Sequence, residues 1–356
     1  MCATHPRNST AIGGGESSAA WLALLCHGIR DFWISLTAYR LSLIAYCLVL
    51  IAIHGCAYAP LRGAGPAPQP LPAEIAAYYA YPSTPTDIHV QLISEHRAFR
   101  EFTIQFPLSV SGFEPTEPTV EFEWFESTQP GRRPAILFNP ILGGDYPLER
   151  NVCRFFARHG FHVALVHRKT LKISPEHPVD RIELLLRQGI LRIRQVVDWM
   201  ETQERVDPQR MGSFGISMGG IASVITAAVE PRLKVHVIAL AGGSIPDILV
   251  TSKDTLLTKP RRRYLTKNHM DLKTLDAVLR QAIRTDPIRL APYVDARHLL
   301  MFVAVGDRTI GRANALRLRR ALGGPTTVFL PTGHYTTYFM LPYLEYASLR
   351  FFKDKF

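Results

Sequence analysis

Cysteine is scarce in this sequence. Only five of its 356 residues are cysteines, and four of them (Cys2, Cys26, Cys47 and Cys56) lie within the first 56 residues. Beyond that point Cys153 is the single thiol, so neither an intrachain disulfide framework nor a cysteine-ligated metal cluster is possible there. Cys153 stands in an amphipathic helical pattern, which predicts a small buried hydrophobic side chain.

Acidic residues are outnumbered by basic ones. The chain has 41 Lys and Arg against 30 Asp and Glu, a net charge of +11. Such a balance suits nucleic acids, anionic membranes or cell-envelope polymers. The densest basic run, KPRRR at Lys259 to Arg263, comes without a nucleic-acid motif or interleaved aromatic residues. The sequence therefore predicts no nucleic-acid partner, and the run instead favours anionic or membrane-derived substrates.

No Lys, Arg, Asp or Glu occurs between Leu41 and Leu61. An apolar run that follows a positive charge and precedes small residues is typical of a secretory signal. The end of the run, IHGC at Ile53 to Cys56, resembles the lipobox of bacterial lipoproteins, which predicts lipidation of Cys56. An uncleaved transmembrane anchor is the alternative, since about 20 uncharged residues can span a bilayer. Both interpretations predict a cell-envelope protein, membrane-anchored and facing outside the cytoplasm.

The rest of the chain divides into a linker and one large domain. Residues 57–86 are rich in Pro, Ala and Gly and predict a linker. In the domain, 87–356, strands are expected first at 87–94, 100–106 and 119–127, as an antiparallel edge. Apolar strands then alternate with helices, which predicts an α/β fold with a mostly parallel sheet covered by helices on both faces. Residues 245–297 are too long for a plain connection and predict a helical cap.

The segment RMGSFGISMGGIAS, Arg210 to Ser223, places a serine between glycines where a predicted strand meets a predicted helix. This is the context that a nucleophile elbow requires. The flanking glycines permit a sharp turn that lifts the Ser217 hydroxyl clear of the surface. Ser217 is therefore the predicted nucleophile; a tight turn without chemistry is the alternative.

A serine nucleophile needs a base, and the base needs a carboxylate to orient it. His334 follows the last predicted strand and is the expected base. His167 also ends a strand at that edge of the sheet and is expected to line the pocket. Asp307 follows a buried strand and is the favoured acid. Asp247 is its rival inside the insertion, and both keep the order serine, acid, histidine.

Acyl transfer also needs hydrogen-bond donors for the developing oxyanion. The backbone N–H of Met218, at the head of the helix after Ser217, is one expected donor. The loop LFNPILGGD, 137–145, follows an early strand and is expected to supply the second. Ile141 is the first choice there, with Leu142 beside it. The glycines of this loop serve equally to turn the chain into the next helix.

Together these motifs resemble the α/β-hydrolase superfamily over residues 134–356, and in particular bacterial serine hydrolases of the dienelactone-hydrolase-like kind. RTDPIRLAPYVDARHLLMFVAVGDR (284–308) and LPTGHYTTYFMLPY (330–343) carry the resemblance around the acid and the histidine. The chain departs from that family in having Ser217 where dienelactone hydrolases have cysteine, and Asn139-Pro140 where many relatives have His-Gly.

The resemblance implies an α/β-hydrolase fold and a serine esterase that cleaves a carboxylic ester of a small-molecule or lipid-like acyl substrate. It implies no metal and no other cofactor. Two alternatives stay open at this point. One is an acyltransferase or peptidase that uses the same three residues. The other is a non-catalytic envelope lipoprotein that binds a ligand.

Overall fold

The computed structural model describes residues 63, 65–82, 84–111, 115, 117–143, 145–168 and 176–356. The segment predicted as a signal or anchor, including Cys56, lies outside these residues. Within them, no helix combines the length and the hydropathy needed to cross a membrane.

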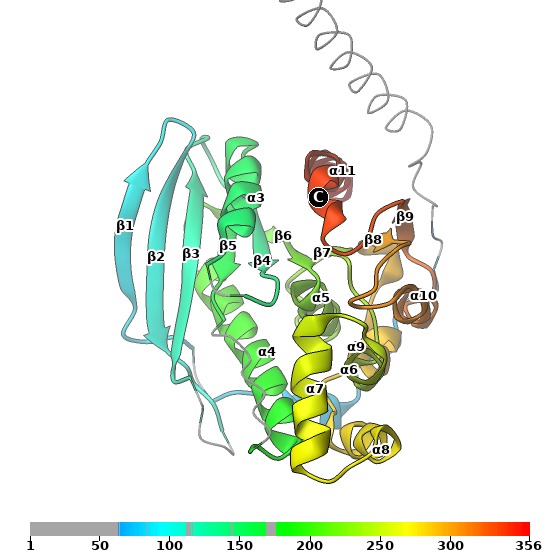
Figure 1. Cartoon of the computed structure of the whole chain (residues 1–356). Coiled ribbons are helices and arrows are strands. Elements are labelled where there is room, and N and C mark those ends of the chain that lie inside the picture. The colour runs from blue at the N-terminus through cyan, green and yellow to red at the C-terminus, as the bar shows by residue number, and fades with distance from the viewer. Residues whose placement is uncertain are drawn as a thin grey trace, which may run out of the picture. The chain divides into compact units, whose positions relative to one another are not determined.

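A nine-stranded sheet runs through the domain in the order β1-β2-β3-β5-β4-β6-β7-β8-β9 (Figure 1). The strands are β1 His89–Glu95, β2 Phe99–Pro107, β3 Thr119–Ser127, β4 Arg133–Asn139, β5 His162–Val166, β6 Val206–Ile216, β7 Val235–Ala239, β8 Leu299–Ala304 and β9 Thr326–Leu330. The first three are antiparallel to one another, and β3 pairs antiparallel with β5. All pairs from β5 to β9 are parallel. The predicted α/β architecture with an antiparallel edge is confirmed.

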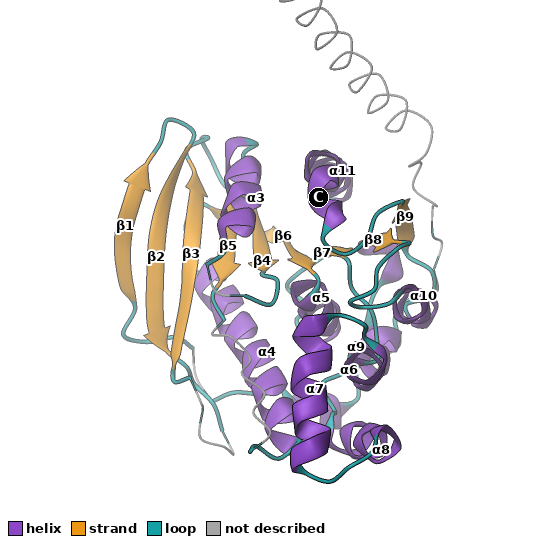
Figure 2. Ribbon diagram, in the orientation of Figure 1, coloured by secondary structure: helices purple, strands orange, loops and turns teal. Residues whose placement is uncertain are grey.

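Helices cover both faces of the sheet (Figure 2). On one face lie α3 (Pro147–Arg158) and α11 (Leu341–Lys355), and on the other lie α4 (Asp180–Glu201), α5 (Met218–Val229) and α10 (Arg312–Ala321). The buried rings of Phe156 and Phe352 pack edge to face with their centroids 5.8 Å apart, and Phe156 also meets Phe214 of β6. Cys153 of α3 is buried as predicted, and burial raises the pKa of its thiol.

The predicted cap, residues 245–297, consists of short helices. They are α6 Ile245–Thr251, α7 Thr255–Lys267, α8 Leu272–Ala282 and α9 Pro287–Leu290, followed by the 3-10 turns η1 Ala291–Tyr293 and η2 Ala296–His298. The first four begin at Ser244, Asp254, Asp271 and Asp286, whose side chains accept a backbone N–H of the first turn. Such N-caps explain why a polar insertion breaks into separate helices.

A linker is expected over residues 57–86, but the second half of this segment packs against the domain. Helix α2 (Ala73–Tyr78) lies within it, and the residues around this helix are bonded to the domain. Tyr79 is 1% exposed and donates a hydrogen bond to Thr285 at 3.0 Å, while Tyr81 donates to the Asp198 carboxylate of α4. The composition, rich in Pro and Ala, does not predict these contacts, because the tyrosine hydroxyls meet their partners only in the folded domain.

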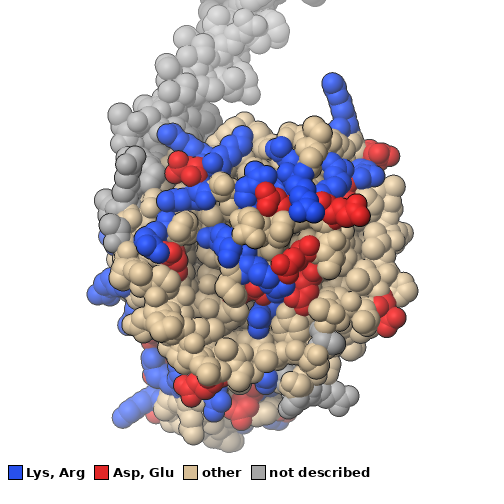
Figure 3. All heavy atoms as spheres, turned by 180° about the vertical axis from the view of Figure 1, so that it is seen from behind, with Lys and Arg blue, Asp and Glu red and all other residues tan. Residues whose placement is uncertain are grey.

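Charged side chains of both signs are mixed on the face turned away from the viewer of Figure 1. There Lys and Arg side chains gather toward the top of the domain with Asp and Glu among them (Figure 3). Figure 3 thus shows basic and acidic side chains interspersed on this face and not a basic stripe of the kind that follows a nucleic-acid backbone. Among the described residues, arginines also pair with glutamates, for example Arg232 with Glu230 at 2.6 Å and Arg150 with Glu123 at 2.6 Å.

Candidate active site

Ser217 lies at the junction of β6 and α5 with φ 57° and ψ −117°, a backbone conformation that is costly for an L-residue. Its N–H donates to the carbonyl of Ala239 on the neighbouring strand at 2.8 Å. The chain packs so closely here that a Cβ at position 219 would overlap the carbonyl oxygen of Asn139, so Gly219 is required. The predicted strand–turn–helix context is present, and it directs the Ser217 hydroxyl into a cavity.

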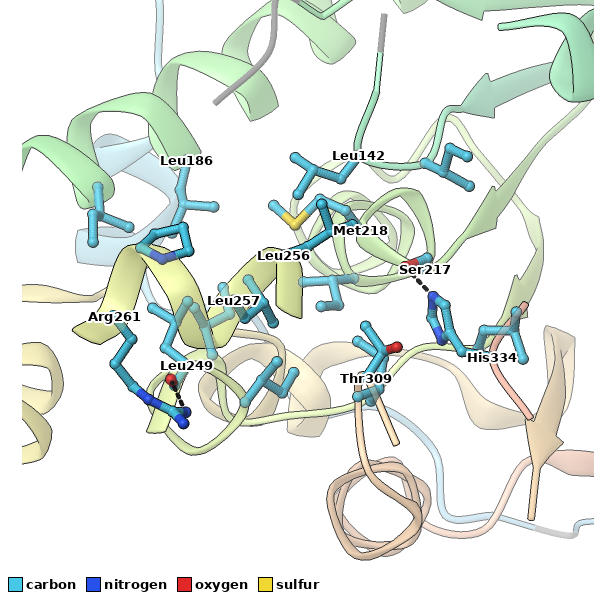
Figure 4. A pocket seen from close by; sticks show the side chains of 18 of the residues that line it. Leu142, Leu186, Ser217, Met218, Leu249, Leu256, Leu257, Arg261, Thr309 and His334 are labelled. Carbon is cyan, nitrogen blue, oxygen red and sulfur yellow. Dashed lines mark hydrogen bonds between the residues drawn. The ribbon is translucent and has the colours of Figure 1, made fainter. Parts of the chain in front are cut away.

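One chain of hydrogen bonds joins Ser217, His334 and Asp307. Ser217 Oγ lies 3.0 Å from His334 Nε2 (Figure 4). His334 Nδ1 lies 2.7 Å from Asp307 Oδ2. The other carboxylate oxygen of Asp307 accepts the N–H groups of Thr309 and Ile310 at 2.8 and 2.9 Å. The side chains of His334 and Asp307 are only 10% and 3% exposed. This arrangement holds the imidazole between a hydroxyl and a carboxylate.

Asp247, the alternative acid, lies in the cap, and its side chain contacts Ser244 and two arginines. It completes a capping box with Ser244 at the start of α6 and forms ion pairs with Arg280 of α8, at 2.6 Å, and with Arg317 of α10. Its two carboxylate oxygens are thus committed to holding α6 against its neighbours.

His167 does not lie at the expected pocket beside Ser217. Its ring lies 3.1 Å from Glu121 and 2.9 Å from Glu123 at the end of β5. It borders a separate cavity of about 40 Å³ behind the loop that follows β4. The prediction failed because the two glutamates on β3, which the sequence placed on an edge strand, come within reach only through the β3–β5 pairing.

The backbone N–H of Met218 begins α5, where no intrahelical acceptor exists, and it lies next to Ser217. Ile141, the first choice for the second oxyanion donor, has its N–H occupied: it donates to the buried carboxylate of Glu149 at 3.0 Å. Leu142 lines the cavity above Ser217 in Figure 4, and its N–H has no acceptor among the residues that the structure describes. The Ile141 N–H thus has a partner outside the cavity, whereas Leu142 is the other candidate that the sequence offers.

The loop after β4 is held from two sides by residues that sequence reasoning missed. Glu149 accepts the Ile141 N–H, and Arg168 donates to the Ile141 carbonyl at 2.6 Å. Burial lowers the pKa of the Arg168 guanidinium. The Asn139 side chain is buried and donates to Ser223 Oγ of α5 at 2.9 Å. A glutamate in the first turn of a predicted helix gives no signal of such a contact in the sequence.

A second carboxylate, also missed, links the cap to the histidine loop. Asp254 caps α7 and also accepts hydrogen bonds from Thr309 Oγ1 at 2.6 Å and from the Tyr335 hydroxyl at 2.7 Å. Burial opposes ionisation of Asp254, but these hydrogen bonds prevail and hold its pKa below the usual range. Although most of the Tyr335 side chain is exposed, partial desolvation and the bond to Asp254 raise its pKa to about 12, so this hydroxyl stays a donor.

Ser217 and His334 border a cavity of about 590 Å³ between the core and the cap. Most of its lining residues are aliphatic, and many of them come from α4, α5 and the cap helices α6, α7 and α8. In Figure 4, Ser217 and His334 lie at one end of this space, and Leu186 and Arg261 lie at the other. Among the described residues, no group of three or more His, Cys, Asp or Glu side chains is placed to hold a metal ion.

The basic run KPRRR lies within helix α7, which directs its side chains to different sides. Arg261 faces the cavity, but its Nη1 donates to the carbonyls of Leu249 and Val250 at 2.9 and 2.6 Å. Lys259, Arg262 and Arg263 are exposed on the rest of the helix surface. Of the described basic residues of this run, Arg261 alone lines the cavity, and its Nη1 already donates to carbonyls of α6.

No protein-family model matches the sequence, and no curated protein matches it either. Solved structures do. Acetyl xylan esterase 1 from Thermoanaerobacterium sp. JW/SL YS485 superposes with a TM-score of 0.57 at 18% identity, over 79% of this chain and 95% of that one. An acetyl xylan esterase from Paenibacillus sp. R4 gives 0.59 at 16% identity, over 80% and 100%. The acylaminoacyl peptidase of Pyrococcus horikoshii gives 0.52 at 14% identity, over 73% of this chain but only 42% of that one.

Proposed function

We propose that this chain, which has the α/β-hydrolase fold, is a serine hydrolase that cleaves carboxylic esters through an acyl-enzyme. The observation that carries the proposal is the continuous hydrogen-bonded path from Ser217 through His334 to Asp307 at the end of a ligand-sized cavity. The fold shared with esterases supports it, although fold alone assigns no reaction.

The geometry supports an ordinary two-step acyl transfer. Ser217 Oγ attacks the ester carbonyl carbon while its proton passes to His334 Nε2. His334 then returns this proton to the alcohol oxygen as the carbon–oxygen ester bond breaks, which leaves the acyl group on Ser217. A water molecule then loses a proton to His334 and attacks the same carbon. His334 passes this proton to Ser217 Oγ as the acyl–serine bond breaks, which releases the acid and the free serine. Asp307 stabilises the imidazolium in both steps.

Negative charge on the carbonyl oxygen needs donors that are already in place. The Met218 N–H, at the positive end of α5, is the first donor in this proposal. The Leu142 N–H is the second, because Glu149 holds the N–H of Ile141.

The test is hydrolysis of p-nitrophenyl butyrate by the wild type and by Ser217→Ala. Turnover should fall by at least about a thousandfold in the variant, since the nucleophile is lost. A serine-reactive phosphonate should label the wild type but not Ser217→Ala. Ser111→Ala, a change at an exposed serine outside the cavity lining, is the matched control and should keep both activity and label. A wild type that neither turns over esters nor takes the label would favour the non-catalytic, ligand-binding alternative.

We also propose a cell-envelope location through the N-terminal segment, on the basis of its uncharged run and the IHGC sequence. Expression of the full chain in a bacterium fed radiolabelled palmitate tests this. The label should enter the wild type and be absent from Cys56→Ser. Equal labelling of both, or of neither, would remove the lipoprotein interpretation.

A further inference from the structure

The cavity at Ser217 is apolar along its whole length. Its far end is formed by leucines, among them Leu186 of α4, which is 7% exposed, and Leu249 and Leu257 of the cap, which are half-buried. Two arginines also line the cavity, Arg181 of α4 and Arg261 of α7, and Arg261 Nη1 donates to backbone carbonyls of α6. A volume of about 590 Å³ lies within the range of sites that enclose a medium-sized ligand and far exceeds what an acetyl group fills.

The position of His334 decides which half of an ester enters this space. Because His334 returns the proton to the alcohol oxygen, the alcohol must leave on the histidine side of Ser217. On that side Tyr335 and Tyr338 are 62% and 61% exposed, so the leaving alcohol has a route to solvent. The acyl group points the other way, toward Leu257 and Leu186 (Figure 4).

From this geometry, and resting on the proposed esterase function, we infer that the substrate is an ester of a medium- or long-chain aliphatic acid whose acyl chain lies between α4 and the cap. An aliphatic chain gains free energy with each methylene that it buries among these leucines. A carbohydrate acid or a short polar acid would instead lose its hydrogen bonds to water and regain few of them among side chains that are mostly aliphatic.

The test compares kcat/KM for p-nitrophenyl acetate, butyrate, octanoate and laurate, all below the concentrations at which they form micelles. For the wild type we expect kcat/KM to rise about twofold to fourfold per buried methylene from acetate to octanoate. Leu257→Trp narrows the cavity and should lower the laurate-to-acetate ratio of kcat/KM at least about tenfold. Leu272→Trp makes the same change at a 44% exposed site of α8 outside the cavity and should keep the wild-type ratio.

A second variant guards against a folding defect. Leu249→Trp obstructs the same space from α6, and the melting temperature of each variant is measured beside its kinetics. A fall in the laurate-to-acetate ratio in both obstructed variants, with cooperative unfolding retained, supports the inference. A wild type that prefers acetate, or obstructed variants that keep the wild-type ratio, would overturn it while leaving the esterase function intact.

A binding measurement separates the inference from the proposed function. Ser217→Ala, which cannot turn over ester, is titrated calorimetrically with laurate and, separately, with acetate. Heat of binding for laurate alone supports an acyl-chain site. Absence of laurate binding contradicts that site even if acetate esters are hydrolysed, whereas a missing phosphonate label on the wild type rejects the esterase function itself.

Discussion

Ser217 keeps an unfavourable backbone conformation because its surroundings leave no alternative. Its φ of 57° would relax only if β6 or α5 moved, and both are fixed by close backbone contacts at Gly215 and Gly219. The strain is useful because it keeps the hydroxyl exposed to the cavity without any rearrangement on binding. Replacing either glycine by alanine would place a Cβ on top of backbone atoms and displace the elbow.

Glu149 offers the most informative substitution at the scale of one residue. Its carboxylate fixes the loop that carries Leu142, so Glu149→Ala should lower kcat for butyrate about tenfold to a hundredfold with little change in KM. Glu149→Gln keeps a neutral acceptor for the Ile141 N–H and should retain most of the activity. If Glu149→Ala instead raises kcat, Ile141 is the second oxyanion donor and the glutamate competes for it.

At the scale of elements, two aspartates with similar sequence contexts have separate tasks. Asp307 follows β8 and contacts His334, whereas Asp247 starts α6 and joins it to α8 and α10. One carboxylate therefore serves the proposed chemistry and the other serves the cap. Helix α6 contributes Leu249 to the cavity, so its anchoring also shapes the acyl-chain site.

Substitution by asparagine should separate these roles. Asp307→Asn should lower kcat for butyrate by about four orders of magnitude, because the imidazole loses its partner for the charged state. Asp247→Asn should leave kcat within about threefold of wild type and lower the melting temperature, by about 2–4 °C for each kcal/mol lost from the capping box and ion pairs. The opposite pattern in the two variants would make Asp247 the acid of the site.

Over the whole molecule, stability depends on histidines that fold in the neutral form. Burial lowers the pKa of His162 and of His236 to about 4 each. His162 accepts the Ser127 N–H at Nδ1 and donates to the Arg205 carbonyl from Nε2, an arrangement that needs the uncharged ring. Protonation of either histidine therefore favours the unfolded chain.

The direction of the pH effect follows from the two pKa values. Between pH 6.5 and 4 the unfolded chain binds more protons than the folded domain, so the free energy of unfolding falls as the pH falls, by roughly 3 kcal/mol per histidine over the window. Urea unfolding at pH 7 and pH 5 measures this. His162→Gln should reduce the pH dependence, and His89→Gln, at an exposed site on β1, should not. A pH dependence that is unchanged in His162→Gln would contradict this assignment.

Much of the fold could be predicted because it depends on local patterns. Strand and helix periodicity gave the β4–β9 sheet and its helices, and the positions of Ser217, Asp307 and His334 at strand ends followed from chain order. The contacts of Glu149, Asp254 and His167 could not be predicted, because each links segments whose proximity exists only after folding. Helix α2 was missed for the same reason: its flanking tyrosines find their partners on α4 and in the loop before α9.

Asp254 connects a wall of the cavity to the loops that carry Asp307 and His334. The same carboxylate starts α7, which forms one wall of the cavity, and holds Thr309 and Tyr335, the neighbours of Asp307 and His334. A cap that swung outward at the start of α7 would therefore pull on the loops that align the proton relay. Asp254 thus connects the stability of one cavity wall to the positions of the two loops that carry Asp307 and His334.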